Sequence, residues 1–275
     1  MAIGQAILLV LFGIGVGTYG TMVGIGGGFV VVPLLLLAFG LDPAPAAATS
    51  LVVVTLNAMS GSATYLRQRR VDVRAGLLLA GAAVPGALIG PLITARIPLQ
   101  GFKLAFGLLL LALSVFLFLN PERKPRDASR RTGPVGGRLV FSGAFTGADG
   151  VTFEYSDSAP MVLAISFGVG IVASMFGIGG GLIHVPALIH IMGFPVHVAT
   201  ATSTFVLGIT SVAGVAQYSA GDYVSWGLAA ALGAGVILGA QLGARISRRM
   251  KGRGIVRLLT LAMVYLAARL LWSAF

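Results

Sequence analysis

The chain has 275 residues, of which 57% are hydrophobic and only 10% are charged, and its mean hydropathy is +0.96. Soluble domains are about one quarter charged, so this composition excludes an ordinary soluble protein and indicates an integral membrane protein. The net charge of +11 comes from Lys and Arg clustered between apolar segments, as topology signals are, so we do not expect nucleic-acid binding.

Ten apolar segments follow one another along the chain. A helix needs about 20 residues to cross a hydrocarbon core of about 30 Å. Strands of a transmembrane barrel would alternate apolar and polar residues, whereas a run such as Leu104–Leu119 is apolar on all sides, so we expect helices. The segments cover residues 3–23, 28–40, 45–66, 75–95, 101–119, 159–176, 181–192, 197–218, 225–246 and 254–273.

Two glycine clusters interrupt these segments. Gly24-Ile25-Gly26-Gly27-Gly28 precedes Pro33, and Gly177-Ile178-Gly179-Gly180-Gly181 precedes Pro186 about 153 positions later. The segments 28–40 and 181–192 that follow are too short to span a membrane comfortably. We therefore expect half-helices that turn back, with the glycines and the two prolines breaking the helix. Irregular backbone at membrane depth must be buried in protein or line a wet cavity.

The two clusters belong to a longer internal repeat. Residues 24–55 and 177–208 are identical at about 14 of 32 positions without a gap. This predicts two homologous membrane halves, residues 1–119 and 158–275, joined by a polar linker at 120–157. The alternation in the second half of the linker predicts a short β-hairpin with its turn at Gly147–Gly150.

The distribution of basic residues predicts how the halves are oriented. Loop 67–74 holds four arginines and its counterpart 220–225 holds none, while loop 96–103 holds two basic residues and its counterpart holds six. Parallel repeats would place equal charge in equivalent loops, so this opposite bias favours inverted repeats. The predicted fold is an all-helical polytopic protein of two inverted repeats with broken, re-entrant helices. It has eight full spans, or about ten segments if half-helices are counted. In the cell's inner membrane, both termini are expected on the external side and the linker on the cytoplasmic side.

The repeated motif resembles a known family. Two copies of Gly-x-Gly-Gly-Gly-x-x-x-x-Pro, each followed by an Ala-Thr-Ser stretch at 48–50 or 201–203, are similar to the TauE/SafE sulfite exporter family, the TSUP transporters. The similarity covers nearly the whole chain. It implies a transporter of small sulfur-containing anions such as sulfite or organosulfonates, with export as the expected direction.

The residues suggest an anion site independently of that resemblance. A helix N-terminus carries about half a positive charge and free N–H donors, and glycine lets a ligand approach them closely. Two inverted half-helices can aim their N-termini at one midplane site. Serine and threonine hydroxyls nearby can donate to the anion. Close helix packing by the glycines, and hydroxyls that bond to their own helix, are the alternatives. The predicted binding residues are Gly24, Gly26, Gly27, Gly28, Thr49, Ser50, Asn57, Gly177, Gly179, Gly180, Gly181, Thr202 and Ser203.

Three histidines occur only in the second half. His184 lies two residues before Pro186 and is the candidate for proton coupling, because histidine titrates near neutral pH. For His190 and His197 a structural or interfacial role is favoured. The histidine spacing does not place all three on one helical face and no carboxylate is near in sequence, so no metal site is expected.

No combination of residues predicts an enzyme. The chain has no cysteine, and its acidic residues fall almost entirely in expected loops rather than in pairs within a membrane segment. No cofactor is expected, and the expected partners are a small anion and the lipid bilayer, with self-association left open. Two other functions stay open: a passive anion channel, and a membrane interaction or assembly protein whose glycines only pack helices.

Overall fold

The computed structural model describes residues 3–119, 140–146, 152–247 and 252–274. Within these ranges the chain forms ten helices and one two-stranded sheet. The elements are α1 Ile3–Val23, α2 Gly28–Leu37, α3 Pro43–Arg67, α4 Val73–Thr94, α5 Leu99–Leu119, β1 Val140–Thr146, β2 Thr152–Ser158, α6 Ala159–Met175, α7 Gly181–His190, α8 Val196–Ala220, α9 Trp226–Ile246 and α10 Gly252–Trp272.

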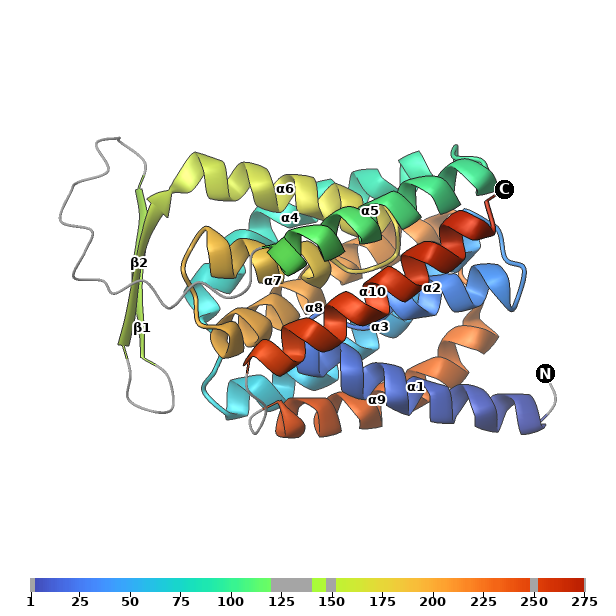
Figure 1. The fold of residues 1–275 in the computed structure, drawn as a ribbon, viewed down its shortest axis with the longest axis horizontal. Helices are drawn as coiled ribbons and strands as arrows, with labels where there is room; N and C mark the ends of the chain where they lie inside the picture. The colour runs from blue at the N-terminus through green and yellow to red at the C-terminus, as the bar shows by residue number, and fades with distance from the viewer. Residues whose placement is uncertain (1–2, 120–139, 147–151, 248–251, 275) are drawn as a thin grey trace.

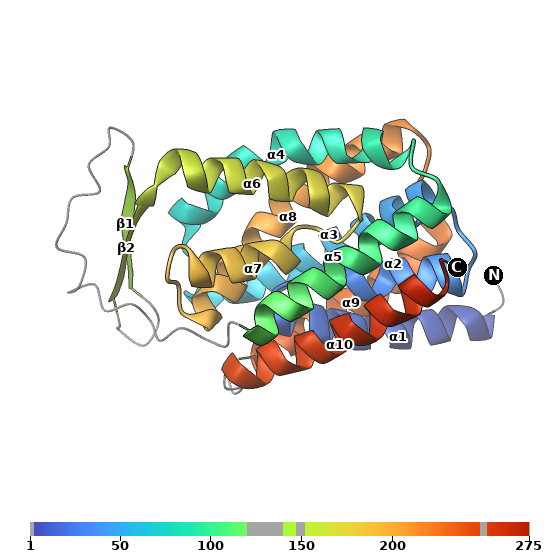
Figure 2. The same cartoon turned by 45° about the horizontal axis from the view of Figure 1, so that its top comes forward.

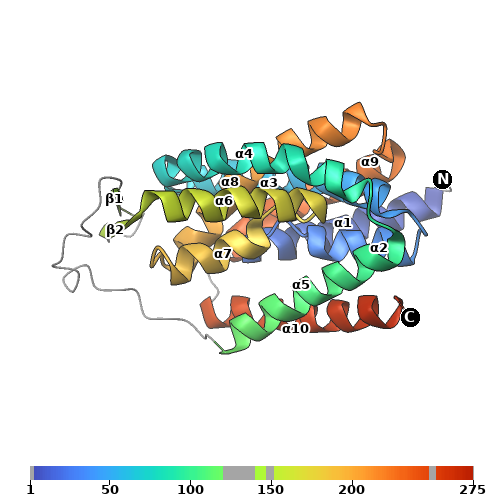
Figure 3. The same ribbon diagram turned by 90° about the horizontal axis from the view of Figure 1, so that it is seen from above.

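The helices run mostly along the long axis of the molecule. The β-hairpin lies at one end, and the start of α1 and the end of α10 lie at the other (Figure 1). Helix α6 leads away from the hairpin, whereas α1 runs toward the hairpin end, so corresponding helices of the two halves run in opposite directions (Figure 1). Helices α5 and α10 lie side by side along one face, which is clearest from above (Figure 3).

The packing of helices is reciprocal between the halves. Helix α1 packs against α9, and its counterpart α6 packs against α4 (Figures 1 and 2). Helices α3 and α8 contact each other in the middle, and each also contacts the helix after its counterpart, α3 against α9 and α8 against α4. Each half therefore completes its packing with helices from the other half.

Glycines allow the two flanking pairs to pack closely. A Cβ on Gly239 of α9 would overlap the backbone of Ile14 in α1, and a Cβ on Gly86 of α4 would overlap the backbone of Phe167 in α6. Small residues at such spacing let membrane helices approach backbone to backbone. Gly239 and Gly86 therefore have the packing role that the sequence left as an alternative for the glycines.

Helices α2 and α7 are short, with 10 residues each, and each leads back from the end of the preceding helix. The return of α7 toward the hairpin end is visible in Figure 2. Pro33 and Pro186 were expected to break these helices, and this is wrong, because α2 and α7 continue through them. A proline near a helix start removes one backbone hydrogen bond, which packing can offset. The chain reverses at the glycines instead.

Two helix starts explain the boundaries around α3 and α4. Asp42 is extended and is followed by Pro43 at the first helical position, where a missing N–H costs nothing. Asp72 caps α4 by accepting a hydrogen bond from the Ala75 N–H at 3.0 Å.

Six helices in the described part of the chain are long and apolar enough to cross a membrane: α1, α3, α4, α5, α8 and α9. The sequence predicts eight spans, the other two being α6 and α10. Helix α6 has 17 residues, fewer than the about 20 that a full span needs, and α10 has 21 residues. The chain is therefore a multi-pass, all-helical membrane protein apart from its hairpin.

The strands β1 and β2 pair antiparallel, with Gly143 opposite Tyr155. Strand β2 continues to Ser158, directly before α6, and β1 continues to Thr146 on the side of the turn. The expected turn at 147–150 and linker residues 120–139 lie outside the described residues. The Tyr155 ring of β2 lies 5.0 Å from the ring of Phe194, a residue just before α8. This contact attaches the hairpin to the helices. Burial, together with the nearby Asp72 carboxylate, raises the pKa of Tyr155 above its usual value.

Candidate functional site: two glycine loops that meet

Two glycine loops connect α1 to α2 and α6 to α7. Gly27 and Gly180 are the N-cap residues of the short helices, and their φ angles of 82° and 85° lie in the left-handed region. Side chains other than glycine lose about 1–2 kcal/mol there. The glycines are needed at these positions because the chain must reverse in one step between two packed helices.

The two loops lie directly against each other, although about 153 residues separate them in sequence. A Cβ on Gly28 would lie 2.5 Å from the Gly177 carbonyl oxygen. A Cβ on Gly181 would overlap the Gly24 carbonyl oxygen in the matching way. The structure thus brings the predicted glycines together, and neither loop leaves room for a larger residue at the contact.

Serine hydroxyls hold the loops across the halves. Ser50 of α3 donates to the Gly177 carbonyl at 2.8 Å, and Ser203 of α8 donates to the Gly24 carbonyl at 3.2 Å. Both serines are fully buried. In this structure their protons are therefore used on loop carbonyls, and their oxygens retain only acceptor capacity.

Most loop N–H groups are also used. The N–H groups of Gly24, Ile25 and Gly26 all donate to the Gly20 carbonyl, at 2.8–3.1 Å. In the second loop Ile178 and Gly179 donate to the Ala173 carbonyl. Among the described residues, no hydrogen bond engages the N–H groups at the two helix starts. These groups belong to Gly27, Gly28 and Phe29 and to Gly180, Gly181 and Leu182. They are the backbone donors of the two loops that have no backbone acceptor in the described structure.

Thr49 and Thr202 face different elements from their serine neighbours. The Thr49 hydroxyl accepts from the Ser225 N–H at 3.0 Å, at the start of α9, and the Thr202 hydroxyl accepts from the Asp72 N–H at 3.1 Å, at the start of α4. Adjacent residues on a helix point about 100° apart, so one of each pair meets a loop and the other a helix start. The structure places these threonines away from the glycine loops.

Asn57 is fully buried on α3. Its Oδ1 accepts from the Thr21 hydroxyl at 3.0 Å, while its Nδ2 has no hydrogen-bond partner among the described residues. A buried donor without a partner is costly, and it is common where a ligand or water completes the site. Asn57 thus has donor capacity available inside the protein.

Val54 and Leu207 occupy matching positions and lie beside both loops. A Cβ on Gly26 would lie 2.9 Å from Leu207 Cδ2 and 3.0 Å from Val54 Cγ1, and a Cβ on Gly179 would crowd the same two side chains. With Ala58 they form a separate buried apolar cluster. The space next to the loops is therefore filled by apolar side chains in this conformation.

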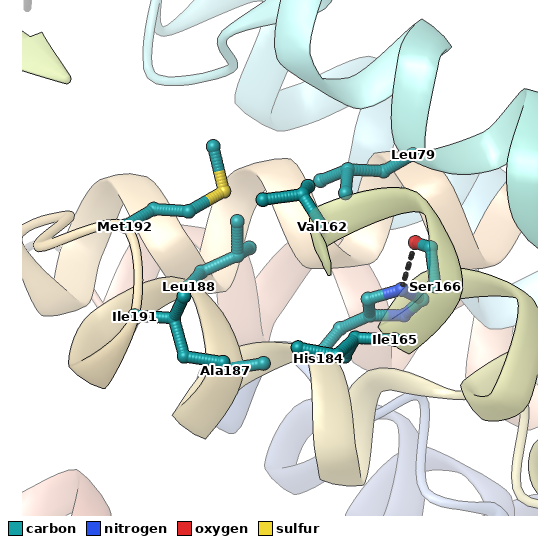
Figure 4. Close-up of a pocket in the computed structure, with 9 residues that line it drawn as sticks. All are labelled: Leu79, Val162, Ile165, Ser166, His184, Ala187, Leu188, Ile191 and Met192. Atoms are coloured by element: carbon teal, nitrogen blue, oxygen red, sulfur yellow. Dashed lines mark hydrogen bonds between the residues drawn. The ribbon is translucent and has the colours of Figure 1, made fainter. Parts of the chain in front are cut away.

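His184 is buried on α7, with 3% of its surface exposed. Its Nε2 lies 2.8 Å from the Ser166 hydroxyl of α6 (Figure 4). Its Nδ1 has no partner within the described residues. His190 bonds instead to the Pro186 carbonyl at 3.0 Å, and the His197 carbonyl accepts from Arg70. Only His184 of the three histidines reaches the neighbourhood of a glycine loop.

A small cavity of about 10 Å³ adjoins the second loop. Its wall includes Gly179, Gly180 and His184, together with the hydroxyl-bearing Ser174, Thr210 and Ser211. No sequence motif marks Ser166, Ser174, Ser211, Val54 or Leu207 as site residues. A serine or valine inside an apolar helix carries little signal, and only the repeat alignment pairs Val54 with Leu207.

Within the described residues, no group of three His, Asp or Glu residues could hold a metal ion. The polar groups beside the loops are backbone N–H groups at the two helix starts and, at the second loop, the His184 imidazole. Helix N-termini attract anions through their partial positive charge.

The comparisons with known proteins agree with this architecture. The family model described as "Sulfite exporter TauE/SafE" matches residues 9–270. A probable membrane transporter protein, YunE of Bacillus subtilis, is 30% identical over 274 residues, covering 97% of each chain. A probable membrane transporter protein of Haemophilus influenzae is 27% identical over 97% of this chain and 94% of its own. One from Methanocaldococcus jannaschii is 25% identical over 88% and 86%. No solved structure matches the chain significantly.

Proposed function

Because the chain belongs to the sulfite exporter TauE/SafE family, whose relatives are probable membrane transporters, we propose that it exports small sulfur-containing anions by alternating access. Sulfite or an organosulfonate is the proposed substrate, and the cell's inner membrane is the proposed location. The observation that carries the proposal is the meeting of two glycine loops whose helix starts keep unused N–H donors.

The proposed mechanism needs two inverted repeats, residues 1–119 and 158–275. The reciprocal packing of α1 on α9 and of α6 on α4 supports this symmetry. The opposite directions of α1 and α6 support it as well (Figure 1). Helices α2 and α7 then act as re-entrant half-helices from opposite sides, and the contact between their loops lies near the membrane midplane.

In this proposal the anion binds at the helix starts. The N–H groups of Gly27, Gly28, Gly180 and Gly181 supply the donors, and the dipoles of α2 and α7 supply partial positive charge. The Asn57 amide adds a donor on the N-terminal side. Ser50 and Ser203 act through the loops, because their hydroxyls hold the loop carbonyls rather than the anion. Thr49 and Thr202 are then proposed to hold helix starts and not substrate.

A site without a charged side chain holds an anion by partial charges alone, which suits a carrier that must release it. Val54 and Leu207 fill the space beside the loops. We infer that this conformation is closed, and that an outward or inward opening must move these side chains before the anion reaches the N–H groups.

The test compares two glycine variants that both place a side chain at a positive φ angle. Gly180→Ala places a methyl group beside the proposed donors, with no atom closer than 3.3 Å to the new Cβ. Gly40→Ala also introduces left-handed strain, of roughly 1–2 kcal/mol, but in open space at the α2–α3 turn. In proteoliposomes Gly180→Ala should lose most sulfite flux, and Gly40→Ala should keep it. Equal flux in the two variants would contradict a site at the α7 start.

The same assay separates the other functions that the sequence leaves open. A carrier should saturate and show counterflow, whereas a passive channel should do neither. A membrane assembly protein should show no flux and should retain a protein partner on purification. Thermal stability measured with sulfite, sulfate, thiosulfate, sulfoacetate and taurine would then rank the substrates, because a bound ligand stabilises the folded state by mass action.

A further inference from the structure

The His184–Ser166 pair breaks the symmetry of the two halves. At the matching positions the N-terminal half has Val31 and Gly13, which carry no hydrogen-bonding side chain. Gly13 instead packs against the backbone of Leu232, and a Cβ there would lie 2.5 Å from the Leu232 carbonyl. The two halves therefore differ at this buried pair, next to the second glycine loop.

His184 lies between two small cavities. On the Ser166 side a cavity of about 20 Å³ is walled by apolar side chains such as Leu79, Val162 and Leu188 (Figure 4). On the other side lies the cavity of about 10 Å³ at the second glycine loop. The Nδ1 atom would lie 3.3 Å from a Cβ on Gly180, so this nitrogen faces the loop.

The loop cavity offers few donors apart from this nitrogen. The Ser174, Thr210 and Ser211 hydroxyls donate to carbonyls of their own helices, at 2.6–3.0 Å. That leaves the N–H groups at the α7 start and the His184 Nδ1, which is unpartnered in the described structure. An anion placed at the α7 start would therefore meet the imidazole directly.

Other titratable groups lie away from this imidazole. None of the residues that line the two cavities, other than His184, is titratable. Helix α6 carries no titratable residue, α8 carries His197 and Tyr218, and α4 carries Arg74 in its first turn after the Asp72 cap. His190 is the other titratable residue of α7, and it bonds to the Pro186 carbonyl. The charge of His184 is thus set by protons and by whatever binds at the loop.

We propose that His184 binds a proton together with each anion, so that the C-terminal half makes the transport proton-coupled. This inference rests on the proposed transport function. An imidazolium alone among apolar walls is unfavourable, and an anion held only by backbone N–H groups is held weakly. Bound together they neutralise each other, so each favours the binding of the other.

The proton step is a simple acid–base exchange. A hydrated proton loses an O–H bond, and the ring nitrogen that lacks hydrogen gains an N–H bond. The reverse step occurs on the side where the anion leaves. Ser166 is a positioning residue, because its hydroxyl can donate to the neutral ring or accept from the charged one, and it holds the ring in both states.

The experiment uses methanesulfonate, the anion of a strong acid, which carries no proton itself. Anion added to weakly buffered, detergent-solubilised protein should be accompanied by uptake of about one proton per chain. In proteoliposomes its flux should rise about tenfold from about pH 8 to about pH 6. His184→Gln should abolish the proton uptake and flatten the pH profile. Ser166→Ala should shift the profile, and Ser166→Thr should restore it.

His190→Gln is the matched control, a histidine on the same helix that stays outside the site and should leave both readouts unchanged. Anion flux with the same proton uptake in His184→Gln as in the wild type would overturn this inference and leave the transport function standing. Absence of flux with methanesulfonate, sulfate and sulfite in the wild type would overturn the transport function and this inference with it.

Discussion

Ser50 and Ser203 show how single hydroxyls connect the halves. Each is fully buried, each lies on a central helix, and each donates to a loop carbonyl of the opposite half, Gly177 and Gly24 respectively. Removing the hydroxyl leaves a buried carbonyl with one partner fewer, which costs about 1–3 kcal/mol when nothing replaces it. The shorter bond belongs to Ser50, at 2.8 Å against 3.2 Å for Ser203.

We therefore expect Ser50→Ala and Ser203→Ala each to destabilise the protein by about 1–3 kcal/mol, with Ser50→Ala the larger effect. Thermal unfolding in detergent measures this, with the exposed Ser219→Ala as control. If Ser50 and Ser203 instead hold the anion through their protons, both variants should lose anion-dependent stabilisation while keeping their unfolding temperature without anion. That result would contradict the role assigned to them here.

Individual residues also show the limits of sequence reasoning. The repeat alignment identified both glycine loops and paired Ser50 with Ser203, and the structure does bring these residues together. It could not tell that adjacent Thr49 and Ser50 face different elements, because that depends on where α9 begins in the folded protein. Ser166 lies 18 residues before its partner His184 and carries no motif, so only tertiary packing reveals the pair.

At the scale of elements, α2 packs against α3, α7 packs against α8, and α3 and α8 pack against each other, so the two short helices are coupled through the central pair. Val54 on α3 and Leu207 on α8 lie beside both glycine loops, and with Ala58 they form an isolated apolar cluster. The sequence pattern of α3 and α8 could not indicate this contact. Both helices carry apolar or small residues on most sides, so no single face stands out as the one that meets the loops. Two apolar side chains beside the loops are suited to exclude water and ions until the helices move.

Val54→Ala combined with Leu207→Ala should therefore open a leak. We expect sulfite flux that no longer saturates and counterflow that is lost, because the closed conformation no longer seals. Truncating Leu207 also costs about 2–5 kcal/mol of stability, so flux must be normalised to folded protein. The matched control is Leu35→Ala, a fully buried leucine of α2 that does not contact the glycine loops' Cβ positions. Saturating flux in the double variant would show that other residues close the path.

At the scale of the whole molecule, the charge bias of the loops and the arrangement of the ends both support the proposed topology. The start of α1 and the end of α10 lie at one end of the long axis, and the hairpin lies at the other (Figure 1). The sequence reached the same separation by counting arginines, and it could do so because the positive-inside rule acts on short loops. It could not predict the interlocked packing of the halves, which depends on glycine contacts such as Gly239 on Ile14.

The absence of cysteine makes this topology directly measurable, since each introduced cysteine is the only thiol in the chain. Gly4→Cys places a thiol near the start of α1, where a Cβ meets nothing within 4 Å, and Ala144→Cys places one on the exposed side of β1. Trp272, 86% exposed, offers a third position near the end of α10.

A membrane-impermeant maleimide applied to intact spheroplasts should label the two terminal positions and should label Ala144→Cys only after lysis. Labelling of Ala144→Cys in intact spheroplasts, with the terminal positions protected, would reverse the proposed orientation while leaving the inverted repeats intact. Labelling of one terminal position without the other would contradict the placement of both termini on the same side of the membrane.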